Sequence, residues 1–428
     1  MKKILILNNA SCFDYSILSN FYSCYQNYFY NSGNCVFYFA FENFLRNHNI
    51  DYECSTCYSA DYINEHFDCV IALAANIFSK NVKFLDFYNQ LLTGVTIPIF
   101  FLTTGIQLEK ENDFDSLILS IKDKSKRLID LVYSTGGEFG LRGNYSKYLF
   151  DLISNNTAEV TGCVSVLLAN KELNVPNFKV NFSDFKPAIN GRIQDIKTEY
   201  FEKIISNNFF TDYIDQDEFG KFLYERKNEN YIRLVRQYSK LGVDLLNKSK
   251  VKLFFSVPEW SNYLKENCNF VFGSRIHGAI LPIVNQIPAL VYARDLRVKE
   301  LCNFYSIPYV SDWRTSDLYE LYQNTDFSSF NKNFSTKYDK LIHFLINHKI
   351  VSSENLQNSK QNSVFDINLA SLKKAKNRIR YLSKYEIIIR YYYMLIKYKL
   401  SKRIVVDNDL LLDIRAAKFL LGKLKTQK

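Results

Sequence analysis

Short apolar runs and longer amphipathic segments alternate along the first half of the chain. Two of the segments, CVFYFAFENFLRNH and NVKFLDFYNQLL, place apolar residues at helical spacing. The apolar runs between them predict strands at KILIL (Lys3–Leu7), CVIALA (Cys69–Ala74), IPIFFLT (Ile97–Thr103) and LVYST (Leu131–Thr135). This alternation is typical of an α/β fold in which helices cover both faces of a parallel sheet.

A polar stretch after Thr161, VPNFKVNFSDFKPAINGRIQD, interrupts the alternation and predicts a domain boundary. The pattern then resumes, with helices expected at Asn228 to Lys240 and Pro258 to Glu266. Strands are expected at VKLFFS (Val251–Ser256), NFVFG (Asn269–Gly273) and ALVYA (Ala289–Ala293). We therefore predict two Rossmann-like domains, at residues 1–175 and 176–350. A cleft between the carboxyl ends of their sheets is the expected ligand site.

Residues 351–428 are predicted to form a linker and a basic, mainly helical extension. Two polar segments are expected to be linker: DFSSFNKNFS, at 326–335, just before this region, and SSENLQNSKQNS, at 352–363, within it. The net charge of +10 belongs to the extension, because Val364–Lys428 holds about 16 Lys and Arg residues against about 5 Asp and Glu. Three interpretations stay open: helices packed on the body, a helix on a membrane surface, and nucleic-acid binding. The last is disfavoured, since one appendage carries all the charge and no binding motif accompanies it.

Composition favours a cytoplasmic protein. The nine cysteines form no disulfide framework, and the Cys54/Cys57 pair lacks the second pair that a zinc site needs, so we expect no metal. The start, MKKILILNNA, has too short an apolar run for a signal peptide. The most apolar stretches, Leu91–Ile106 and Gly278–Ala293, are interrupted by Gly, Pro or polar residues, which indicates buried core segments instead of membrane spans.

The segment GSRIHG lies between a predicted strand and a predicted helix. Ser274, Arg275 and His277 are therefore expected where free backbone N–H groups and the helix dipole favour an anion. Arg275 suits a two-pronged bond to phosphate or carboxylate, His277 suits proton transfer, and Gly278 allows a close approach. Alternatively, His277 is simply a buried hydrogen-bonding residue. The first interpretation predicts an acidic ligand whose chemistry needs a proton.

A longer pattern resembles the polysaccharide pyruvyl transferase family. GSRIHGAILPIVNQIPALVYARDLRVKELCNFYSIPYV is similar to its GSRxHG turn, apolar helix, xIPA strand and D-x-R-x-x-E-L helix. Upstream, FFLTTGIQL and FGLRGNYSKYLFDLISNNTAEVTGCVSVLL resemble its GIG strand and its V-T-G-C-P-S unit, so the likeness covers about Leu5 to Val310. Two departures are ALAANIFS, where a glycine-rich turn is usual, and Val164, where proline is usual.

The resemblance implies two domains in a GT-B-like arrangement and transfer of a pyruvyl group from phosphoenolpyruvate to a sugar, as a ketal, with release of phosphate. The acceptor would be a cell-surface polysaccharide or its lipid-linked precursor, no cofactor would be needed, and the protein would work in the cytoplasm or at the inner face of the membrane. His277 would be the acid/base and Arg275 the anion ligand. The secondary anion contacts would be Arg294, Asp295 and Arg297, and Ser274, Gly278 and a cleft-facing Arg142 would also belong to the substrate-binding residues.

Other interpretations of these residues and of the chain remain. Asp295 equally suits the N-cap of a helix, and Arg142 equally suits an exposed helix start. The whole chain also suits a nucleotide-sugar glycosyltransferase of the same architecture, which nucleotide binding would reveal. A third alternative is a non-catalytic member of a polysaccharide assembly complex, in which His277→Ala would leave cellular function intact.

Overall fold

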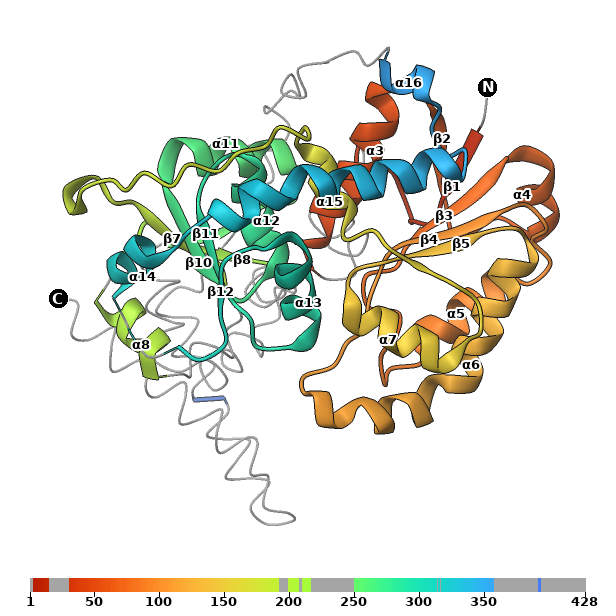
Figure 1. Cartoon of the computed structure of the whole chain (residues 1–428), viewed down its shortest axis with the longest axis horizontal. Helices are drawn as coiled ribbons and strands as arrows, with labels where there is room; N and C mark the ends of the chain where they lie inside the picture. Colours follow the sequence, from red (N-terminus) through yellow and green to blue (C-terminus); the bar gives the residue numbers. More distant parts are fainter. Residues whose placement is uncertain are drawn as a thin grey trace.

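In the part of the chain that the structure describes, the strands form two parallel six-stranded sheets, which lie in separate halves of the molecule in Figure 1. The computed structural model describes residues 3–14, 31–191, 199–207, 210–216, 250–313, 315, 317–357 and 392–393. The strand orders are β2-β1-β3-β4-β5-β6 and β12-β11-β10-β7-β8-β9, and the pairings are parallel throughout. The predicted α/β class with two Rossmann-like sheets is confirmed.

The first sheet has its most apolar strands at the centre. β3 and β4 are buried along their whole length, which explains why both are continuous apolar runs in the sequence. Helices α4, α5, α6 and α7 pack on one face of this sheet, whereas α3 and α15 contribute to the core on the other. The strands are β1 (Lys3–Ile6), β2 (Asp51–Cys54), β3 (Cys69–Leu73), β4 (Ile99–Thr104), β5 (Glu138–Leu141) and β6 (Glu159–Val160). The helices are α3 (Asn34–Asn47), α4 (Ala60–His66), α5 (Lys83–Leu91), η1 (Glu111–Asp113), α6 (Phe114–Ser134), α7 (Asn144–Ile153) and η2 (Val164–Leu168).

The second sheet is covered in the same way. Helices α11, α12 and α13 bury apolar residues in the core that α3 also joins, while α8 and α14 cover the opposite face. The strands are β7 (Pro187–Ile189), β8 (Tyr213–Asp215), β9 (Val251–Leu253), β10 (Phe270–Gly273), β11 (Ala289–Tyr292) and β12 (Tyr309–Val310). The helices are η3 (Phe182–Asp184), α8 (Glu199–Ser206), α11 (Val257–Asn267), α12 (Ile276–Val284), α13 (Leu296–Tyr305), α14 (Leu318–Asn324), α15 (Ser328–Asn347) and α16 (Ser353–Gln357).

The two sheets share one apolar core. Phe100 and Leu102 of β4 belong to the same buried cluster as Ile280 of α12. The long helix α15 lies across both halves of the molecule in Figure 1. At its end, His348 Nε2 lies 3.1 Å from the Glu138 carboxylate of β5. The residues that follow the second sheet therefore pack back on the first.

Two sequence predictions about local structure were wrong. Leu131–Thr135 was predicted as a strand, but Leu131–Ser134 ends α6 because Leu128 and Val132 continue its helical apolar stripe. The strand starts only after Gly136, whose φ of 76° forms the turn. DFSSFNKNFS was predicted as linker, but most of it forms the first turns of α15, where Phe330 and Phe334 are buried four residues apart.

The remaining tail and loop predictions meet the structure only in part. SSENLQNSKQNS, also expected to be linker, begins with the short helix α16. The predicted helix at 228–240 and nearly all of the basic extension lie outside the described residues. Within the described part of the chain, no helix has the length and apolar character needed to cross a membrane.

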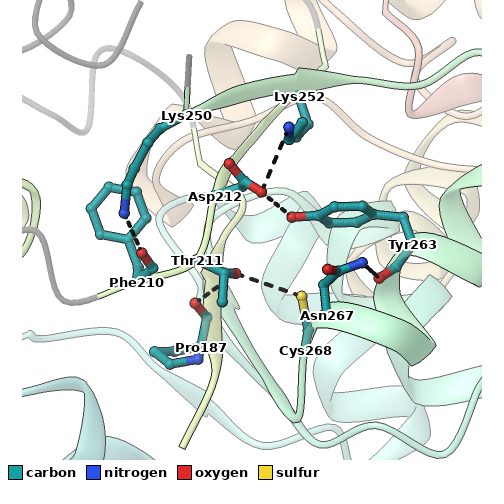
Figure 2. A network of polar contacts seen from close by, with 9 residues as sticks. All are labelled: Pro187, Phe210, Thr211, Asp212, Lys250, Lys252, Tyr263, Asn267 and Cys268. Carbon is teal, nitrogen blue, oxygen red and sulfur yellow. Dashed lines mark hydrogen bonds and ion pairs between the residues drawn. The ribbon is translucent and has the colours of Figure 1, made fainter. Parts of the chain in front are cut away.

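A polar network joins the amino ends of the second sheet's strands to α11 (Figure 2). Tyr263 donates a hydrogen bond to Asp212, which also lies 3.9 Å from Lys252. Thr211 Oγ1 donates to the Pro187 carbonyl at 3.1 Å and lies 3.8 Å from Cys268 Sγ. Pro187 begins β7, Thr211 and Asp212 directly precede β8, and Lys252 lies in β9, so the network stabilises the edge of the sheet opposite the carboxyl ends.

Candidate active site

The candidate active site lies at the carboxyl end of β10. Ser274 and Arg275 follow this strand directly, and α12 begins at Ile276, three residues earlier than the apolar pattern indicated. His277 therefore sits in the first turn of the helix. Arg275 is 7% exposed and His277 6% exposed, so both are held inside the protein.

His277 contacts the first domain on several sides. Its Nε2 lies 3.5 Å from Arg142 Nη2 and 3.8 Å from Cys163 Sγ, and its ring centroid lies 5.2 Å from that of Phe37. Arg142 follows β5, Cys163 follows β6, and Phe37 belongs to α3. The carboxyl ends of both sheets thus meet at His277, where α/β proteins usually bind ligands.

The electrostatics of the site keep the imidazole neutral. Burial lowers the pKa of His277 well below 6.5, and the charges of Arg142, Arg297 and Arg275 lower that pKa further. Arginine can only donate hydrogen bonds, so the Nε2 that faces Arg142 acts as an acceptor. A neutral imidazole among three guanidinium groups can take a proton from a substrate hydroxyl.

Two arginine side chains of the site, Arg142 and Arg297, each keep a buried Nε without a hydrogen-bond partner among the described residues. Arg142 is 1% exposed. Burial lowers the pKa of Arg297, and the charges of Arg142 and Arg275 act in the same direction. A buried guanidinium is costly unless it pairs with an anion, so the cluster suits a ligand with several acidic oxygens.

Arg142 was expected either to face the cleft or to lie on the surface at a helix start, and the structure rules out the surface position, because Arg142 is buried with its Nη2 3.5 Å from His277 Nε2. Asp295 caps α13 by accepting a hydrogen bond of 2.9 Å from Val298 N, and it pairs with Arg297 at 3.2 Å. Arg294 is exposed, and the arginine charges that lower the His277 pKa are those of Arg142, Arg297 and Arg275. The structure therefore brings together Arg142, Arg275, Arg297 and His277, with Ser274 buried beside them.

Gly278 has a packing role that the sequence did not specify. A Cβ at this position would lie 2.0 Å from Asn190 Oδ1. The Asn190 amide donates to the Ile214 carbonyl at 3.2 Å and accepts from Gln216 Nε2 at 3.0 Å. The close approach at Gly278 is thus made by the Asn190 side chain, while a ligand contact there stays a prediction.

Four side chains at the site were missed by sequence reasoning. Phe37 and Cys163 contact His277, and Glu300 accepts hydrogen bonds from Ser146 across the two domains. Glu300 belongs to the quoted D-x-R-x-x-E-L pattern, so an acidic residue on the buried face of that helix was the available signal.

Within the described ranges, no three His, Cys, Asp or Glu side chains group as metal ligands would.

The backbone beside the site is strained. Thr103, the last residue but one of β4, has a φ of 61°, which is unfavourable for a β-branched residue. Its hydroxyl accepts a hydrogen bond of 3.1 Å from Val164 N, the residue after Cys163. Strain of this kind persists where the surroundings fix it, and it often accompanies functional sites.

The sequence and the fold of the chain are similar to those of known proteins. A family model described as polysaccharide pyruvyl transferase matches residues 25–295, a range that contains Arg142, Arg275 and His277. No curated protein matches the chain. The chain is similar to the structure of a candidate UDP-N-acetylglucosamine 2-epimerase from Listeria monocytogenes, at 10% identity and a TM-score of 0.40, covering 79% of this chain and 90% of that one. It is also similar to an S. aureus MnaA structure with UDP, at 12% identity and a TM-score of 0.40, covering 82% and 99%.

Proposed function

The chain belongs to the polysaccharide pyruvyl transferase family, and from this premise we propose that it transfers the pyruvyl group of phosphoenolpyruvate to a sugar. The product is a pyruvate ketal on a cell-surface polysaccharide or its lipid-linked precursor, and phosphate is released. The observation that carries the proposal is the buried His277, which burial and the nearby charges of Arg142, Arg297 and Arg275 keep neutral and which Arg142 contacts.

The arginines suit the donor. Phosphoenolpyruvate carries a carboxylate and a phosphate close together, and planar guanidinium groups bind both through paired hydrogen bonds. Arg275 stands at the start of α12, where the helix dipole adds to the attraction. The negative charge of the bound donor would offset the arginine charges that lower the His277 pKa. The pKa of His277 would then rise, and its imidazole could hold a proton.

The proposed reaction moves protons and forms two C–O bonds. With the donor bound, His277 holds a proton and gives it to the methylene carbon, and the neighbouring carbon becomes cationic. A sugar hydroxyl bonds to that carbon as the neutral His277 takes the hydroxyl proton. A second hydroxyl of the same sugar then bonds there, and phosphate leaves with the electron pair of its C–O bond and with the proton of that second hydroxyl. No electrons are exchanged with a cofactor, and a positioned acid/base accelerates such steps by about 10²- to 10⁴-fold.

Phosphate release from phosphoenolpyruvate tests the proposal. The assay uses simple and lipid-linked galactosyl, mannosyl and N-acetylhexosaminyl acceptors with wild type, His277→Ala and the control His343→Ala, which removes an exposed histidine of α15. We expect acceptor-dependent release that falls by about 10²-fold or more in His277→Ala and is unchanged in His343→Ala. Equal release in all three proteins would remove His277 from the chemistry. No release with any acceptor, together with nucleotide-sugar binding, would favour a glycosyltransferase.

A further inference from the structure

A buried carboxylate from the second domain holds the helix that follows Arg142 in the first. Glu300, on α13, is 2% exposed. Its carboxylate accepts hydrogen bonds from the Ser146 backbone N at 3.0 Å and from Ser146 Oγ at 2.8 and 2.9 Å. Ser146 lies in the first turn of α7, where N–H groups lack partners within the helix. Glu300 therefore caps a helix of the other domain, and an anion there is favoured by the helix dipole.

Two glycines make room for this contact. A Cβ at Gly143 would lie 2.9 Å from Glu300 Cβ. A Cβ at Gly105 would lie 2.9 Å from Arg142 Cδ and 3.3 Å from Glu300 Oε1. Gly143 thus leaves room for Glu300, and Gly105 leaves room for both Glu300 and the Arg142 side chain.

Ser146 also ties the contact to the first sheet. Its hydroxyl accepts a hydrogen bond of 3.1 Å from Ile106 N, just past β4, while it donates to Glu300. Arg142 N donates to the Thr104 carbonyl at 2.8 Å. The ends of β4 and β5 are in this way linked to α13 through one serine and one carboxylate.

The surroundings of Glu300 are mainly basic. Burial raises its pKa to about 7, whereas the Ser146 hydrogen bonds and the charges of Arg142 and Arg297 oppose that rise. The hydrogen bond to Glu111 is the main cause of the raised pKa of Tyr145 on α7, and the Glu300 charge adds to it. Burying a carboxylate is costly, so a contact that served only to pack the domains would be as stable with apolar side chains.

We propose that Glu300 is a positioning residue that fixes Arg142 of the first domain against His277 of the second, so that arginines from both domains face one anionic ligand. The inference rests on the proposed function, in which that ligand is the phosphoenolpyruvate donor. Arg142 lies four residues before Ser146, at the start of the segment that Glu300 holds. Loss of the Glu300 contact would let that segment shift while the rest of each domain keeps its core.

The test compares full-length wild type with Glu300→Gln and Ser146→Ala. Glu111→Gln is the matched control, because the exposed Glu111 carboxylate accepts a hydrogen bond of 2.6 Å from Tyr145 of the same helix without joining the two domains. Binding of inorganic phosphate and of phosphoenolpyruvate is measured by calorimetry, and kcat and KM by phosphate release. We expect the Kd for both ligands and the KM for the donor to rise by about tenfold to a hundredfold in the first two variants, and not in the control.

The combined variant Glu300→Gln/Ser146→Ala sharpens the result. Its loss should equal that of the stronger single variant, because both changes break one contact. Unchanged Kd and KM in Glu300→Gln and Ser146→Ala would overturn the proposal while leaving pyruvyl transfer intact. Phosphate binding that weakens in both variants, in a protein that releases no phosphate from the donor, would support Glu300 and overturn the proposed function. A wild type that binds neither ligand would overturn both.

The pH dependence of stability gives a second readout. A raised pKa means that the folded protein binds the Glu300 proton more tightly than the unfolded chain, whose value is near 4.5. This contribution to stability is fully present below about pH 4.5 and is lost as the pH rises through about 7. Between these values, the free energy of unfolding should therefore fall less steeply in Glu300→Gln than in wild type. Parallel curves would show that Glu300 does not titrate in this contact.

Discussion

At the scale of single residues, the site depends on how three positive charges act on one imidazole. Arg142, Arg297 and Arg275 lower the His277 pKa together with burial. Removing one of them, as in Arg275→Gln, should raise that pKa toward 6.5, so that His277 becomes protonated at a higher pH than in wild type. The imidazole resonance of His277, followed by NMR as the pH is lowered, measures the change directly.

A surface arginine provides the control for this prediction. Arg127→Gln removes an equal charge from an exposed position on α6 and should leave the His277 titration where it is in wild type. If the Arg275→Gln variant titrated at the wild-type pH, the arginine charges would not be acting on the imidazole and desolvation alone would set its pKa. In enzyme assays, the loss of kcat/KM on the acid side should move to higher pH in Arg275→Gln.

The sequence identified part of this residue set. His277 and Arg275 stand in one short motif between a strand and a helix, so local pattern was enough to single them out. Phe37, Cys163 and Glu300 come from segments far apart along the chain, and only the folded structure places them beside the motif or beside Arg142. Local chemistry was therefore predictable, whereas the partners of each side chain were not.

At the scale of elements, the packing of α12 on the second sheet depends on the absence of a side chain at Gly278. In Gly278→Ala the new Cβ would meet the Asn190 amide at 2.0 Å, and that amide is held by Gln216 and the Ile214 carbonyl. Such overpacking should lower the free energy of unfolding by about 1–3 kcal/mol. Urea denaturation of wild type and variant measures the loss.

A second substitution separates overpacking from other effects of the alanine. Asn190→Ala removes the amide atoms that lie closest to the new Cβ, so the Gly278→Ala/Asn190→Ala variant should lose less stability than the two single losses added together. Simple additivity would mean that the amide is not what Gly278 accommodates.

The strand predictions were confirmed where an apolar run stands alone. They were wrong where the run is also part of the apolar stripe of a helix. The strands β1, β3, β4, β10 and β11 follow unbroken apolar runs, and each was predicted within about two residues. Leu131–Thr135 is an equally apolar run, but it continues the stripe of the 21-residue helix α6. The start of α15 was hidden by its many Ser and Asn residues, because only Phe330 and Phe334 reveal its buried face.

At the scale of the whole molecule, one core joins the two sheets and the site lies where their carboxyl ends meet. The sequence predicted two α/β units but could not show that α15 returns to the first sheet, since that contact joins His348 to Glu138 across the chain. The net charge is the remaining global feature, and it is carried by Val364–Lys428, nearly all of which lies outside the described residues.

That charge predicts how the whole protein meets a membrane. A segment that mixes Lys and Arg with Tyr, Ile and Leu is attracted to anionic lipid by about 1 kcal/mol for each basic residue near the surface. The full-length protein should therefore sediment with vesicles containing phosphatidylserine and not with phosphatidylcholine vesicles, and added salt should release it. Replacing Lys373, Lys374 and Lys376 by Glu should weaken this binding.

Replacing Lys122, Lys126 and Lys147 of the first domain in the same way provides the control, because an equal loss in both variants would mean that net charge, and not the extension, determines binding. If the sedimented fraction changed neither with the lipid charge nor with the substitutions in the extension, the prediction would be wrong. A lipid-linked acceptor would then have to be recognised by the folded domains alone.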